Sequence, residues 1–164
     1  QRQVTELKAE TERAGTLITA AKQFAFAAAK SGQNSPHSAA RWEQIESLWS
    51  QSINRLEEIP TGNPDYVEAQ KLLASYQTNL GTVQTRRKLE QESVEALEQA
   101  NSQIESLVAS IPADAKFVAR NRTASELQGI INELEKVQNG TTAYLKAQEL
   151  LLSAKNKLKQ LKPR

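Results

Sequence analysis

The sequence predicts an all-α fold of two tandem antiparallel three-helix units that share one long central helix. First, the segment Tyr66–Leu73 (YVEAQKLL) returns as Tyr144–Leu151 (YLKAQELL) at an offset of about 78 residues, which indicates an internal repeat. Second, apolar residues recur every three to four positions through most of the chain, the spacing of one face of an α-helix. The repeat continues upstream in three aligned apolar pairs: Ile53 with Ile131, Leu56 with Leu134, and Ile59 with Val137.

Composition narrows the classes of function. Of the 164 residues, 38% are hydrophobic but only 5% are aromatic, so the core is thin and suits packed helices better than a sheet. The absence of cysteine excludes disulfides, thiolate metal sites and cysteine nucleophiles. A formal net charge of +2 is too small to predict an electrostatic partner, and we expect neither a cofactor nor a nucleic-acid partner.

No stretch of the sequence is apolar for the roughly 20 residues that a membrane-spanning helix needs. The chain contains no methionine and begins at Gln1, so we expect a processed product or an excised part of a longer protein. A membrane attachment would then come only from an anchor that precedes Gln1.

The first two helices are predicted on either side of a loop. Apolar residues at helical spacing, many of them alanine, run from Val4 to about Lys30. After a glycine- and serine-containing break, Ser35 followed by Pro36 is a typical N-cap and first helical residue. The second helix then continues until Pro60 stops it.

The third helix is predicted to be unusually long. Asn63 followed by Pro64 marks its start. No strong breaker follows before Pro112, because Gly81 alone costs only about 1 kcal/mol relative to alanine. We therefore expect one helix over about residues 64–111, roughly 70 Å long at 1.5 Å per residue. Its first half would close the first unit, and its second half would open the second.

Two further helices complete the second copy. Asp114 is a candidate N-cap for the fourth helix, which would run to about Val137. The capping-box pattern Thr123–Glu126 is an alternative start for the same helix. A fifth helix is predicted from Thr142 to about Lys162.

The predicted units comprise residues 1–81 and 82–164. Short loops make neighbouring helices antiparallel. Isolated helices of this length are only marginally stable in water, so packing of their apolar faces must stabilise the fold. Tandem three-helix bundles of the spectrin type agree best with the shared central helix, and a tetratricopeptide-like stack is the alternative.

The first copy contains a pattern of core and turn residues: Trp42, Trp49, Ile53, Leu56, Ile59, Pro60, Tyr66, Ala69, Leu72, Tyr76, Asn79 and Leu80. The second copy carries its companions: Leu127–Gly129, Gly140–Tyr144, Ala147 and Leu158. The pattern resembles a helical repeat of many uncharacterised cyanobacterial proteins, and the likeness covers most of Phe24–Leu158. The resemblance implies a helical fold and, as in several such proteins, a membrane tether through an N-terminal segment. It implies no catalytic residues.

The residue patterns of common active sites are missing. His37, the only histidine, stands at a predicted helix start, so we interpret it as a cap or loop residue. The six glycines are too widely spaced for a P-loop or a dinucleotide fingerprint. Glutamates pair with basic residues one helical turn away, as in Arg86–Glu90 and Lys88–Glu92, and such surface pairs contribute roughly 0.2–0.5 kcal/mol each. We predict no catalytic, cofactor or metal site and no enzymatic activity.

Lysines gather at the end of the chain. Lys155, Lys159 and Lys162 share one face of the last predicted helix, where they could contact an anionic surface such as lipid. Lysines also suit a helix C-terminus because of the helix dipole. We favour the interpretation of a solvated face.

Trp42 and Trp49 lie on one face of the second predicted helix, and we expect Tyr66 and Tyr76 to lie opposite them. We interpret both tryptophans as core anchors of the first unit. The alternative is that one of them is a partly exposed anchor for a protein partner. Leu127 stands in the place of Trp49 in the second copy, so if one unit alone binds something, we expect the first.

The sequence therefore predicts architecture far better than activity. We expect a non-enzymatic helical spacer and protein-interaction module, a rigid two-unit rod within a larger protein that a preceding segment could tether to a membrane. The alternative is a sensor domain that binds a small apolar molecule or lipid between the helices of the first unit, suggested by the richer aromatic content of that unit.

Overall fold

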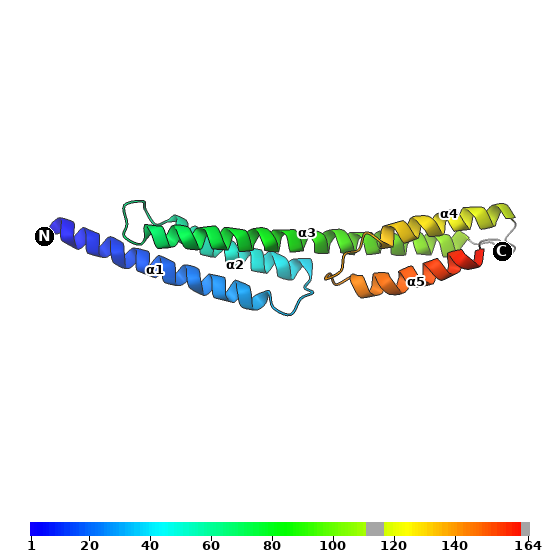
Figure 1. Cartoon of the computed structure of the whole chain (residues 1–164), viewed down its shortest axis with the longest axis horizontal. Coiled ribbons are helices and arrows are strands. Elements are labelled where there is room, and N and C mark those ends of the chain that lie inside the picture. Colours follow the sequence, from blue (N-terminus) through cyan, green and yellow to red (C-terminus); the bar gives the residue numbers. More distant parts are fainter. Residues whose placement is uncertain (111–116, 162–164) are drawn as a thin grey trace. The chain divides into compact units, whose positions relative to one another are not determined.

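The computed structural model of the chain is all-helical, as the sequence predicts (Figure 1). It describes residues 1–110 and 117–161, and within these ranges it contains no β-strand. The helices of the described ranges are α1 (Arg2–Ser31), α2 (Ala39–Glu57), α3 (Tyr66–Ser110), α4 (Phe117–Leu134) and α5 (Tyr144–Leu161). The predicted helix stop at Pro112 and the candidate N-cap Asp114 lie outside the described residues.

The chain divides into two compact units. Unit 1 contains α1, α2 and α3 as far as Arg87, and unit 2 begins at Lys88 and also takes in Pro36–Ser38. α3 is 45 residues long, so the long helix predicted over residues 64–111 is present and continues through Gly81. In each unit three helices contribute residues to a common core, which is the arrangement of a three-helix bundle.

The core of unit 1 is built along an alanine-rich face of α1. Its buried α1 residues are Ala14, Ile18, Ala21, Ala25 and Ala28, at alternating spacings of four and three. These small side chains let α2 approach closely, and the Ser52 hydroxyl of α2 donates a hydrogen bond to the Ala21 carbonyl oxygen at 2.6 Å. α2, α3 and the turn between them complete two buried clusters. One contains Ile53, Leu56, Ile59, Ala69 and Leu73, and the other contains Trp42, Ile45, Trp49 and Val83.

The core of unit 2 relies more on leucine and isoleucine. Its buried members are Ala96, Ala100, Leu107, Leu127, Ile130, Ile131, Leu134, Val137, Ala143, Ala147, Leu151 and Ala154. The three apolar pairs that align in the sequence repeat are buried in both units, so the repeat is a repeat of core positions. Each fully buried leucine or isoleucine contributes roughly 1.5–3 kcal/mol through the hydrophobic effect.

Asn63 holds the turn before α3, although α3 begins at Tyr66 and not at Pro64 as predicted. Its side-chain oxygen accepts a hydrogen bond from the backbone N–H of Asp65 at 2.9 Å, two residues later in the turn. Its side-chain nitrogen donates to the Glu10 carbonyl oxygen of α1 at 3.3 Å. One side chain therefore fixes the turn and ties it to α1.

The turn before α5 is capped from another helix. Thr141 stands where unit 1 has Asn63, and its hydroxyl donates to the Gln138 carbonyl oxygen at 2.7 Å instead of capping α5. The Glu90 carboxylate, from α3, accepts hydrogen bonds from the Thr142 backbone N–H at 3.0 Å and from the Thr142 hydroxyl. Ser93, also from α3, accepts a hydrogen bond from the Gln138 N–H at 3.0 Å. Two side chains of α3 thus hold this turn.

Two predicted helix starts are wrong. α2 begins at Ala39, so Ser35 is not its N-cap, and Ser38 is the serine that directly precedes the first helical residue. The same residue type occurs at both positions, and the sequence pattern alone does not separate them. The alternative start at Thr123 is also wrong, because α4 begins at Phe117 and Glu126 instead forms an ion pair with Arg122 one turn earlier, at 3.2 Å.

The predicted surface pair Arg86–Glu90 is wrong as well. Glu90 is only 1% exposed because its carboxylate is used by the turn before α5. The guanidinium of Arg86 lies over the ring of Trp42 instead. The pair Lys88–Glu92 is present at 3.9 Å, with both side chains exposed.

Candidate functional site

A groove in unit 1 contains both tryptophans of the chain. We call it the unit 1 groove; it has a volume of about 360 Å³ and lies between the end of α1, the start of α2 and the middle of α3. Its lining residues are Ala28, Ala29, Gly32, Gln33, Ser35, Trp42, Ile45, Trp49, Asn79, Thr82, Val83 and Arg86. The floor is apolar and the rim is polar, which is the usual composition of a small-molecule site.

The two tryptophans belong to the core and to this groove. Trp42 is 5% exposed and Trp49 is 6% exposed, so each presents only an edge to the groove. The ring of Trp49 packs against that of Tyr76 with the centroids 5.4 Å apart and the planes tilted by 51°. We also expected Tyr66 opposite the tryptophans, but it packs against the buried cluster that contains Ile53 and Leu56. Burial raises the pKa of Tyr76, and nearby Lys22 partly offsets this effect.

Two neighbouring arginines of α3 have different surroundings. Arg87 forms an ion pair with Glu46 of α2, with 2.7 Å between Nε and the carboxylate oxygen. Arg86 has no acidic partner among the described residues; its guanidinium carbon lies 5.9 Å from the centroid of the Trp42 ring. The rim of the unit 1 groove therefore carries a positive charge that no described carboxylate balances.

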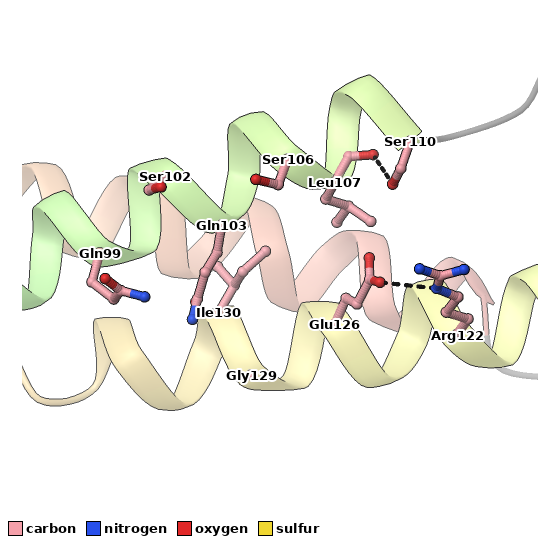
Figure 2. A pocket seen from close by; sticks show the side chains of 10 residues that line it. All are labelled: Gln99, Ser102, Gln103, Ser106, Leu107, Ser110, Arg122, Glu126, Gly129 and Ile130. Atoms are coloured by element: carbon pink, nitrogen blue, oxygen red, sulfur yellow. Dashed lines mark hydrogen bonds and ion pairs between the residues drawn. The ribbon is translucent and has the colours of Figure 1, made fainter.

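Unit 2 has a larger groove between α3 and α4, whose lining residues are mostly polar; it is shown in Figure 2. We call it the unit 2 groove; its volume is about 530 Å³. Its lining residues are Gln99, Ser102, Gln103, Ser106, Leu107, Ser110, Arg122, Glu126, Gly129 and Ile130. The only charges in this lining, Arg122 and Glu126, form an ion pair with each other at 3.2 Å, so the groove has no unbalanced charge.

Three lining residues of the unit 2 groove differ from their counterparts in unit 1. Aligning the buried positions Ala14, Ala21 and Ala28 of α1 with Ser93, Ala100 and Leu107 of α3 makes Gln103 the counterpart of Phe24. The ring of Phe24 lies beneath Arg55, whose guanidinium carbon is 5.4 Å from the ring centroid.

The repeat also pairs two residues of α2 with two of α4: Leu48 with Glu126, and Gln51 with Gly129. Unit 2 therefore has polar groups or no side chain where unit 1 has Phe24, Leu48 and Gln51, and all three unit 2 residues line the groove.

Gln103 carries an unsatisfied polar atom at this place. Its side chain extends from α3 toward α4, beside Ile130 (Figure 2). Its side-chain oxygen is buried, and no described residue donates a hydrogen bond to it. An unpaired buried acceptor costs roughly 1–3 kcal/mol, so this position is a weak point of the unit 2 core.

The predicted lysine face is described in part. Lys155 and Lys159 of α5 are exposed and border a shallow hollow with Leu158. Lys155 forms an ion pair at 3.7 Å with Glu135, the residue that follows α4. Lys162 lies outside the described residues. A single exposed pair of this kind is worth little, so the surface is consistent with a solvated face.

No three or more His, Cys, Asp or Glu side chains within residues 1–110 and 117–161 come together in a way that could hold a metal ion. None of the helices described here has an apolar stretch long enough to cross a membrane. His37 lies half-buried in the loop between α1 and α2, the place that the sequence predicts.

Two polar residues distinguish the grooves, Arg86 and Gln103, and the sequence pattern predicted a groove role for neither. Arg86 was placed in a surface pair, yet it follows the core residue Val83 by three positions and so shares its face of α3. Gln103 becomes noticeable only when α1 is aligned with the later part of α3, where the sequence similarity is too low to set the register. Comparisons of the chain with protein-family models, curated proteins and solved structures find no match.

Proposed function

We propose that the chain is a non-enzymatic helical spacer and protein-interaction module of a larger protein. The observation that supports it is the continuity of α3. Leu73 and Val83 of this helix belong to the unit 1 core, whereas Ala100 and Leu107 belong to the unit 2 core. Because tertiary packing stabilises a helix far more than its intrinsic propensity does, a helix packed in two cores resists melting between them.

Exposed apolar residues support the interaction part of the proposal. Leu145 and Leu152 of α5 are 77% and 64% exposed and are seven residues apart, which places them on one face of the helix. An apolar helix face of this kind is a common docking surface for a partner helix.

Distance measurement along α3 tests the spacer. The chain has no cysteine, so spin labels attach only at introduced sites such as Gln77→Cys and Asn101→Cys, both at exposed positions. An unbroken α-helix places these two Cα atoms about 36 Å apart, and double electron–electron resonance should give a narrow distribution near that value. The control pair Lys71→Cys and Thr85→Cys, within unit 1, should give about 21 Å.

The two label pairs separate the outcomes. If the control pair behaves as expected while the longer pair gives a broad or much shorter distribution, α3 is broken between the units. The spacer proposal would then fail, since the observation that supports it is an unbroken α3.

A second candidate function is favoured by the unit 1 groove. In this alternative the chain is a sensor domain that binds a small molecule or lipid between the helices of unit 1. The supporting observation is that the only two tryptophans of the chain both line this groove, on an otherwise apolar floor. Unchanged tryptophan fluorescence across a screen of metabolites and lipids would argue against it.

A further inference from the structure

We propose that the unit 1 groove binds a small amphiphilic anion, with its apolar body in the groove and its anionic end at Arg86. The inference rests on the second candidate function and names the chemical class of its ligand. A medium-chain carboxylate or an aryl sulfonate has this chemistry.

The apolar part of the unit 1 groove is lined by large side chains from α2 and α3 and by small residues at the end of α1. Trp42, Ile45, Trp49 and Val83 belong to one buried cluster of unit 1, and each also borders the groove. On the α1 side the lining residues are Ala28, Ala29 and Gly32, which leave the space between the helices open. A volume of about 360 Å³ lies within the usual range of small-molecule sites, roughly 300–1,000 Å³.

The anionic end is inferred from the surroundings of Arg86. Arg87, the next residue, is neutralised by Glu46 at 2.7 Å, but no described carboxylate pairs with Arg86. The guanidinium of Arg86 is held near the Trp42 ring at the rim of the groove. A planar guanidinium binds carboxylate, sulfonate and phosphate groups through two parallel hydrogen bonds, so an anion there would gain a fixed orientation.

The second copy lacks this combination and serves as an internal comparison. The repeat places Arg120, Thr123 and Leu127 where unit 1 has Trp42, Ile45 and Trp49. The apolar wall is therefore particular to unit 1, and binding in the groove should be read by tryptophan fluorescence, since unit 2 contains no tryptophan.

The test uses anilinonaphthalene sulfonate, a fluorescent aryl sulfonate, and octanoate as a competitor. We expect quenching of tryptophan emission with energy transfer to the bound probe, and displacement of the probe by octanoate. Arg86→Gln should weaken binding of both anions about tenfold, the loss expected for one charge-assisted contact. Lys88→Gln, which removes an exposed cation of the same helix, should leave binding unchanged. Ala29→Phe, at an exposed position of the groove wall, should abolish it.

Circular dichroism melts confirm that each variant is folded. If neutral octanol displaces the probe as well as octanoate does, and Arg86→Gln changes neither, the groove binds apolar molecules and the anionic class is wrong while the sensor function stands. If folded wild-type protein binds neither the probe nor octanoate, or if Ala29→Phe binds them as well as wild type, the inference is overturned. An unchanged tryptophan spectrum with all of these compounds would count against the sensor function itself.

Discussion

The Ser52 hydroxyl donates a hydrogen bond to the Ala21 carbonyl oxygen across the interface of α1 and α2, at 2.6 Å and with both residues fully buried. Unit 2 has Ile130 where unit 1 has Ser52. One unit therefore joins its first two helices through a polar contact at close range, and the other does so through a bulky apolar side chain.

Replacing Ser52 by alanine should destabilise unit 1 moderately. The variant loses one buried hydrogen bond, and we expect the free energy of unfolding to fall by about 1 kcal/mol in urea denaturation. Ser52→Ile, which copies unit 2, should be worse by about 1–3 kcal/mol because the small side chains of α1 bring the backbone too close for it. Ser75→Ala, at an exposed position of α3, is the control. A Ser52→Ile protein as stable as wild type would mean that α1 and α2 are not packed this closely.

Removing the Glu90 carboxylate should destabilise unit 2. Glu90→Ala leaves the Thr142 N–H without its partner and creates a cavity, so we expect a loss of about 2–3 kcal/mol and faster amide hydrogen exchange at Thr142. Glu90→Gln retains an acceptor oxygen and should recover part of the loss. Glu92→Ala, which removes only an exposed ion-pair partner, should unfold close to wild type. Equal effects of Glu90→Ala and Glu92→Ala would contradict the capping role.

Replacing Gln103 by leucine should stabilise the protein. The change removes a buried oxygen without a hydrogen-bond donor and adds apolar contact with Ile130 and Leu107, so we expect a gain of about 1 kcal/mol. Gln77→Leu, at an exposed position of the same helix, should give no such gain. A loss of stability in Gln103→Leu would show that the amide is satisfied in solution, for example by a bound water.

Stability should decline at alkaline pH in part because of Tyr76. Burial raises its pKa in the folded state, so the unfolded chain loses this proton first as the pH rises above about 10. The contribution of Tyr76 is therefore fully present below that pH and is lost as the pH rises through the folded-state pKa. Urea denaturation from pH 9 to pH 11 should show a smaller decline for Tyr76→Phe than for wild type. Absorbance titration of the folded wild type should show a late tyrosinate component that Tyr76→Phe lacks.

Apolar periodicity was sufficient to locate the helices, although the capping signal misplaced the start of α2. It predicted the continuous α3 because Gly81 is an isolated weak breaker in a helix that is packed on both sides of it. It also placed Tyr76 opposite the two tryptophans, and the ring of Tyr76 packs against that of Trp49. The Asn63–Pro64 pair located the turn before α3 because it is a local signal, although the helix begins two residues after Pro64.

Polar residues inside the core were not predictable in the same way. Near the middle of α3 the apolar spacing predicts that Leu89 is buried. Leu89 is instead 37% exposed, and the buried residues there are Glu90 and Ser93. Both buried residues are held by partners more than forty positions away, Gln138 and Thr142, and no local pattern reveals such contacts. The unit 2 groove was not predicted for a related reason. In the sequence, a glutamine whose side-chain oxygen is buried without a hydrogen-bond donor, as in Gln103, looks the same as an exposed glutamine.

The contrast between the two turns also sets an order of assembly. The hydrogen bond of the Asn63 side chain joins residues two positions apart, so it can form as soon as Asp65 has been synthesised. The hydrogen bond between Glu90 and Thr142 joins residues 52 positions apart, so it can form only after α3 has formed. Closing such a long loop also costs more entropy than closing a short one. During synthesis on the ribosome, unit 1 can therefore fold before α5 emerges. α5 can then pack against an α3 that has already formed.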